Sequence, residues 1–216
     1  MIGEDKLKEI CNQYGIDYEK LVKNNSNVLR YGEYGEICDI LNYLRNELDI
    51  APKNIEKCPS ILCFGSNNIK KNWEFLKNSK IVISNVETCL HVLSTETVEL
   101  IKTYNYVKEN YGIEYINKTT SILNINVERI KEIENNFVNL KPKVIIQASY
   151  SRFNIEELKK IIEVCRENNI EIAVSAFKRS AEEMKEIIEV CRKNDIEITE
   201  SVFLKSAEKL KKMWNI

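Results

Sequence analysis

Residues 157–208 constrain the fold most strongly, because they contain one 26-residue unit twice in succession. When residues 157–182 are set against residues 183–208, 17 of the 26 positions are identical. A fixed period of this size is the signature of repeat architectures, in which each unit stacks on its neighbours. The sequence therefore predicts a stack of similar units before any single element is assigned.

Each copy reads as a long helix followed by a shorter one. Residues 158–165 carry apolar side chains at helical spacing, which form one stripe. Ser180 stands three residues before Glu183, which is the spacing of a capping box at a helix start. The apolar segments 170–172 and 196–198 then lead into the short helices. One such unit cannot bury both of its faces alone, so we expect its neighbours to cover it.

Similar units extend back along the rest of the chain. One equivalent residue in each short helix marks the repeat, with spacings of 34, 31, 30, 28, 26 and 26 residues. These markers are Ser26, Ser60, His91, Ser121, Ser149, Ser175 and Ser201. We therefore predict an all-α fold, an α-solenoid of about seven stacked long–short helix repeats with a period of 26–34 residues. This single helical-repeat domain is expected to occupy residues 1–216.

Two places in this scheme carry specific expectations. Pro142 disfavours helix in the residue before it, so the long helix of that unit should end near Leu140. Residues 144–146 should then form the apolar connection. At the C-terminal end, the repeat register places Met213 and Trp214 at core positions, and we expect Trp214 to cover the last exposed apolar stripe.

The composition limits the class of protein. The formal net charge is −1, so no global basic field indicates a nucleic-acid partner, and the scarcity of Gly and Pro suits a helical protein. The N-terminal residues lack a signal-peptide pattern. No apolar run approaches the ~20 residues that span a bilayer. We expect a cytoplasmic protein without membrane association.

The residues with chemical reactivity do not form a catalytic motif. The seven cysteines include no CxxC pair and His91 is the only histidine, so we predict free thiols and no metal site. Neither a serine–histidine–acid arrangement nor a glycine-rich phosphate loop is present. We expect no enzymatic activity, no catalytic residues and no cofactor.

One segment resembles a known repeat family. In the repeat of mitochondrial transcription termination factors, a short helix ends in Pro-x-Leu-Leu and the following long helix ends in Phe-Leu. Residues 54–76 resemble this repeat, with Pro59 and Leu62 in the short helix and Phe75-Leu76 in the long one. The resemblance implies an α-solenoid whose concave, basic face binds nucleic acid. It supplies no base-contacting residues, because those positions have no motif to match.

Cationic residues recur at the turn between each short helix and the next long one. If these turns line up along one edge, they form a ridge of cations that could contact successive phosphates. The alternative is that the residues are polar only because turns are solvated. The candidate nucleic-acid-binding residues are the turn residues Arg30, Arg152, Lys178, Arg179 and Lys205, with Lys70 and Lys71 as a further pair nearby.

Two functions of different classes follow from these observations. The first is nucleic-acid binding along a concave or edge surface, which the family resemblance and the cations favour. The second is a protein–protein interaction scaffold with no nucleic-acid role, because concave repeat surfaces commonly hold extended partners. The near-neutral charge suits the scaffold. A continuous positive groove would favour the first function, and a groove of mixed charge the second.

Overall fold

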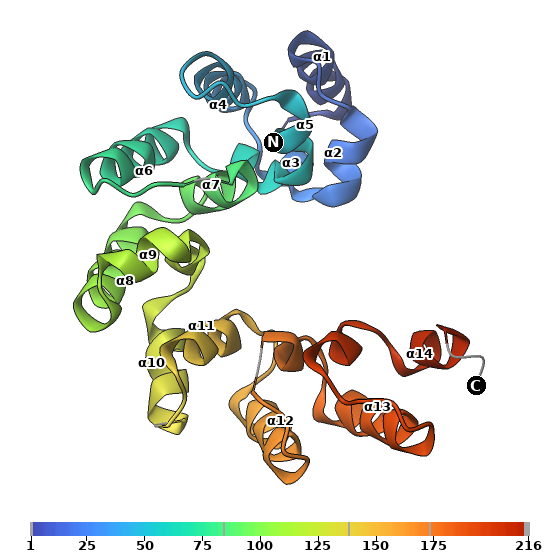
Figure 1. The fold of residues 1–216 in the computed structure, drawn as a ribbon. Helices are drawn as coiled ribbons and strands as arrows, with labels where there is room; N and C mark the ends of the chain where they lie inside the picture. The colour runs from blue at the N-terminus through green and yellow to red at the C-terminus, as the bar shows by residue number, and fades with distance from the viewer. Residues whose placement is uncertain (1, 84, 138, 173, 214–216) are drawn as a thin grey trace. The chain divides into compact units, whose positions relative to one another are not determined.

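The computed structural model describes residues 2–83, 85–137, 139–172 and 174–213. Within these ranges the chain is entirely helical, with α-helices and short 3-10 helices and no strand (Figure 1). The all-α prediction is therefore confirmed for the described residues. The chain divides into two compact units, Met1–Val127 and Glu128–Ile216, which are described separately below.

The first unit alternates long helices with pairs of short elements or a single short helix. Each long helix lies beside the next long helix, and the short elements likewise pack against one another. The long helices are α1 (Glu4–Tyr14), α4 (Tyr34–Asn46), α6 (Ser66–Asn78) and α8 (Thr97–Tyr111). The short elements are α2 (Tyr18–Asn24), α3 (Asn27–Tyr31), α5 (Pro52–Lys57), η1 (Pro59–Cys63), α7 (Val86–Leu93), α9 (Ile113–Lys118) and η2 (Thr120–Asn124).

The second unit continues the alternation with shorter connections. α12 lies beside α13, α13 beside α14, and η3 beside η4. Its long helices are α10 (Val127–Asn136), which starts at the boundary, α12 (Ile155–Glu167), α13 (Ala181–Lys193) and α14 (Ala207–Met213). Its short elements are α11 (Pro142–Tyr150), η3 (Val174–Lys178) and η4 (Glu200–Leu204).

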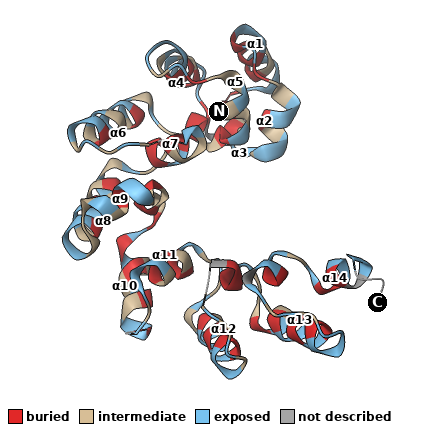
Figure 2. Ribbon diagram, in the orientation of Figure 1, coloured by how far each residue is buried: buried red, intermediate tan, exposed pale blue. Residues whose placement is uncertain are grey.

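The tandem copies fold as their local sequence predicts. The apolar stripe of α12 is buried, with Leu158 and Ile161 at 0% exposure, and Figure 2 shows the same one-sided burial in α13. Ser180 and Glu183 form a complete capping box at the start of α13. Both helices end before an αL residue, Asn169 or Asp195, at φ 54° and 50°. The periodicity and the caps together therefore set the helix boundaries.

The unit around Pro142 differs from the expectation. α10 ends at Asn136, before the proline, but Pro142 is the first residue of α11 rather than part of a connection. Proline suits this position because the N–H that it lacks would have no acceptor within the helix. Residues 144–146 are consequently helical, and the prediction of an apolar connection there is wrong.

At the C-terminal end the repeat register holds only in part. Leu210, which the 26-residue register aligns with Leu158 and Met184, is in the core at 1% exposure. Met213 is 53% exposed, so its predicted core position is wrong. Trp214 lies outside the described residues, and its predicted packing stays a prediction. Within the described ranges, no helix combines the length and the apolar character that crossing a membrane requires.

Candidate functional site

Four of the long helices, α4, α6, α10 and α12, share a contact at their N-terminal ends. The residue at the third helical position, N3, reaches the start of the next long helix. In α12 this residue is Glu157, whose carboxylate accepts a 2.7 Å hydrogen bond from the backbone N–H of Ala181, the first residue of α13. In α4 it is Glu36, which accepts at 2.7 Å from the backbone N–H of Ser66, the first residue of α6. The first N–H groups of a helix lack an intrahelical acceptor, so each contact satisfies one of them and fixes two neighbouring helix ends.

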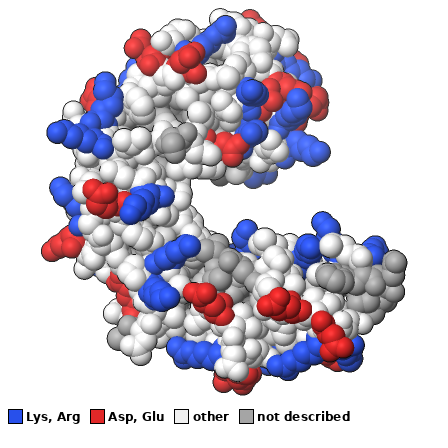
Figure 3. Space-filling model, in the orientation of Figure 1, with Lys and Arg blue, Asp and Glu red and all other residues white. Residues whose placement is uncertain are grey.

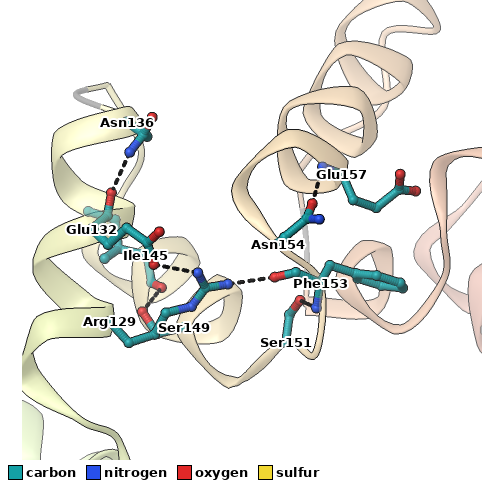
Figure 4. A network of polar contacts seen from close by, with 9 residues as sticks. All are labelled: Arg129, Glu132, Asn136, Ile145, Ser149, Ser151, Phe153, Asn154 and Glu157. Atoms are coloured by element: carbon teal, nitrogen blue, oxygen red, sulfur yellow. Dashed lines mark hydrogen bonds and ion pairs between the residues drawn. The ribbon is translucent and has the colours of Figure 1, made fainter.

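Other side chains at N3 make the equivalent contact with different chemistry. Asn68 in α6 accepts hydrogen bonds from the backbone N–H and the hydroxyl of Thr97, at 3.1 and 2.8 Å. N3 of α10 is Arg129, which donates a 2.6 Å hydrogen bond to the backbone carbonyl of Phe153, just before α12 (Figure 4). The Arg129 guanidinium also pairs with Glu132 at 2.6 Å. The turn that leads into a long helix is thus held by the long helix before it.

Three of the residues predicted to bind nucleic acid lie at these turns in the second unit. Arg152 precedes α12, Lys178 ends η3 and Lys205 precedes α14. Arg152 and Lys178 are exposed and Lys205 is half-buried. The Arg152 guanidinium lies 5.4 Å from the centroid of the Phe153 ring. In the part of the chain that the structure describes, the side chains of Lys178 and Lys205 form no hydrogen bond or ion pair, so their charges are available to a ligand.

Arg179, which was predicted to bind nucleic acid, is occupied within the protein. Its Nε donates a 3.2 Å hydrogen bond to the backbone carbonyl of Phe203 in η4. Its Nη1 lies 3.7 Å from a carboxylate oxygen of Glu183. The side chain is 23% exposed. Arg179 therefore connects two neighbouring short–long turns, and its charge is already partly balanced.

The remaining predicted cations belong to the first unit. Arg30 lies in the last turn of α3 and is exposed. Lys70 and Lys71 are exposed residues of α6 rather than turn residues. The Lys70 ammonium lies 5.5 Å from the ring centroid of Tyr43 on α4, a cation–π distance.

The second unit also contains a groove that the sequence analysis did not predict. It lies between α12 and α13 and has a volume of about 800 Å³. Val164 and Ala181, both buried, contribute apolar surface, and Phe153 lies at the N-terminal end. The charged lining residues are Arg152, Glu157, Lys160, Glu163, Glu167, Glu182 and Lys185. We name this feature the α12–α13 groove.

A sequence signal for the groove exists, although it is incomplete. Lys160, Glu163 and Glu167 recur at helical spacing, so they share one face of α12 beside Val164. Whether that face stays open depends on how α13 packs, which the pattern of one helix cannot show. The charges of the groove are mixed in sign, as are those on the visible face of each unit in Figure 3.

One thiol lies beside the histidine of the chain. Cys58 Sγ lies 3.4 Å from His91 Nε2, within hydrogen-bond reach. Burial raises the pKa of the Cys58 thiol, and raises the pKa of Cys89 and Cys165 to about 11. These thiols therefore stay protonated near neutral pH, whereas a nucleophile must be a thiolate. No group of three or more His, Cys, Asp or Glu residues is placed to hold a metal ion in the described ranges.

The chain matches no family model, no curated protein and no solved structure. The resemblance of residues 54–76 to the repeat of mitochondrial transcription termination factors thus stays an expectation from sequence.

Proposed function

We propose that this chain is a helical-repeat protein that binds a partner polypeptide in the α12–α13 groove. The observation that carries the proposal is the lining of the groove, in which charged side chains of both signs stand above a base of buried apolar residues. Its volume of about 800 Å³ lies within the roughly 300–1,000 Å³ typical of ligand pockets, so a few residues of a chain fit.

The charges of the groove favour a polypeptide over a nucleic acid. Four glutamates line it against two lysines and one arginine. The side chains of Glu163, Glu167 and Glu182 form no ion pair with any described residue. A phosphate backbone would be repelled by these carboxylates, because nucleic-acid affinity comes largely from cations placed against phosphates. A polypeptide can instead present charges of both signs and an apolar side chain.

The finer architecture forms part of the proposal. We propose that the long–short alternation continues as one α-solenoid of seven repeats, each stacked on the next. The N3 contacts support this arrangement, since they recur between successive long helices in the first unit and in the second. Solenoids of this kind present long surfaces to extended partners.

A selection experiment tests the proposed function. A random peptide library displayed on phage is selected on the immobilised full chain, and hydrogen exchange of the chain is then measured with and without the enriched peptides. We expect protection in residues 155–167 and 181–185. Absence of enrichment, or protection confined to other segments, would contradict a peptide-binding groove.

Nucleic-acid binding at the turns is the second candidate function. One observation favours it: Arg152, Lys178 and Lys205 stand in successive short–long turns of the second unit. The family resemblance of residues 54–76 implies the same function. The test is a titration with single- and double-stranded DNA and RNA at two salt concentrations, because binding through phosphates weakens steeply with salt.

A further inference from the structure

We infer that the α12–α13 groove selects a basic polypeptide segment, in which lysines or arginines flank an apolar residue. This inference rests on the proposed peptide-binding function and adds the chemistry of the partner.

The apolar base of the groove favours an uncharged side chain in the partner. Val164 is 2% exposed and Ala181 is 5% exposed, so they form the base of the groove rather than its rims. Both side chains are short, which leaves the space above them open between the two helices. A small or medium-sized apolar residue of the partner can fill this space against the apolar base without the cost of burying a charge or an unpaired polar group.

The charges divide the groove into two halves along α12. In the N-terminal half, cations and carboxylates alternate: Arg152, Lys160 and Lys185 lie among Glu157 and Glu182. Glu157 is already engaged, since its carboxylate accepts from Ala181 and lies 3.9 Å from the Lys160 ammonium. This half therefore has little net charge to offer a ligand.

The C-terminal half is acidic. Beyond Lys160 the α12 side of the lining consists of Glu163, Val164 and Glu167. The two glutamates stand four residues apart on one helical face, where like charges repel each other. The arginine at the far end of α13, Arg192, donates a 2.8 Å hydrogen bond to the side chain of Asn168 and is not ion-paired with either glutamate. A cation from a partner would relieve this repulsion.

These two halves give the bound segment a direction. Its basic residues lie against Glu163 and Glu167, its apolar residue lies over Val164 and Ala181, and any acidic residue lies toward Arg152. A ligand of the opposite character, acidic throughout, would place like charges against the C-terminal half. Complementary charge mainly confers specificity and speed of association, so the acidic half should decide which peptides are selected.

The test compares peptide selections and measures the affinity of the enriched sequences. Short random peptides displayed on phage are selected on the full chain, and the enriched peptides are titrated against three proteins. These are the natural chain, the double variant Glu163→Gln/Glu167→Gln, and the control variant Glu197→Gln, which changes an exposed glutamate outside the groove. We expect a consensus with Lys or Arg beside an apolar residue, and roughly tenfold weaker binding to the double variant than to the control.

The other outcomes contradict either the inference alone or both the inference and the proposed peptide-binding function. Enriched peptides that protect the groove in hydrogen exchange but are neutral or acidic overturn the inference and leave the proposed function standing. Basic peptides that bind the natural chain and the double variant equally also overturn the inference, because their attraction is then not to Glu163 and Glu167. If no peptide protects residues 155–167 and 181–185, both the inference and the peptide-binding function fail.

Discussion

The Glu157 carboxylate accepts a hydrogen bond from the backbone N–H of Ala181, which ties the third residue of α12 to the first residue of α13. The two residues are 24 positions apart in the chain, and the donor is one of the N–H groups that a helix leaves unsatisfied. The contact therefore serves both helices at once. Both residues line the α12–α13 groove.

Replacing this carboxylate should destabilise the protein. We expect Glu157→Ala to lower the free energy of unfolding by about 1–2 kcal/mol, as the loss of a helix cap usually does. The control is Glu156→Ala, which removes the neighbouring exposed glutamate and its surface ion pair with Lys159. That variant should change stability by less than about 1 kcal/mol. Urea denaturation followed by circular dichroism measures both, and equal losses would show that the contact with Ala181 contributes nothing.

The capping box of α13 should make stability depend on acid pH. Hydrogen bonds from Ser180 hold the pKa of Glu183 below its usual 4.5. A carboxyl whose pKa is lowered by folding contributes stability while it is ionised, fully above the unfolded value and progressively less as the pH falls through the folded pKa. The difference in stability between the natural chain and Glu183→Gln should thus be constant from neutral pH down to about pH 5.5 and shrink below pH 4.5. A difference that does not change between pH 7 and pH 3 would contradict this account.

A buried asparagine of α6 should stabilise the protein through its hydrogen bonds to the C-terminal end of α7 and the residues just after it. Asn72 is 0% exposed, and its amide donates to the backbone carbonyls of Leu93 and Thr95, at 3.1 and 2.6 Å. Asn72→Leu leaves both carbonyls without this donor, so we expect a loss of about 1–3 kcal/mol in the free energy of unfolding. The matched control is Asn67→Leu at an exposed position of the same helix. If the two variants unfold at the same urea concentration, the buried amide has no special role.

The nucleic-acid candidate makes a separate prediction about the turns. Charge reversal at Lys178 and Lys205 together should weaken any binding to DNA or RNA, and reduce the slope of log affinity against log salt by roughly 1.5. Arg179 is unsuitable for this test because it holds Phe203 and Glu183, so its replacement would disturb the fold. The control is the reversal of Lys209, an exposed residue of α14 outside the predicted set. Unchanged affinity and slope in the double variant would show that these turns do not bind nucleic acid.

The parts of the fold that depend on local sequence could be predicted. The apolar stripe through Leu158, the capping box at Ser180 and the helix ends at Asn169 and Asp195 each depend on residues of a single repeat. The error at residues 144–146 has a local cause as well. Pro142 was interpreted as a helix breaker, although proline is equally compatible with the first position of a helix.

The candidate sites were predicted less completely, because they depend on contacts between neighbouring helical repeats. The turn positions of Arg152 and Lys178 follow from the repeat register alone. The engagement of Arg179 with Phe203 does not, since it joins residues 24 positions apart whose proximity requires the packed helices. The α12–α13 groove needed both helices in place, so the pattern on α12 could not reveal it.

The contact between Glu157 and Ala181 also bears on how a chain like this can change in length. The acceptor and the N–H that it caps both lie within the 26 residues that are repeated, and Glu183 and Ala207 stand at the corresponding positions of the second copy. An additional copy inserted between them would bring its own acceptor and its own helix start. A chain that gained or lost one whole copy would keep a glutamate at every such position. That glutamate can serve the next helix, as Glu157 does, or cap its own helix, as Glu183 does.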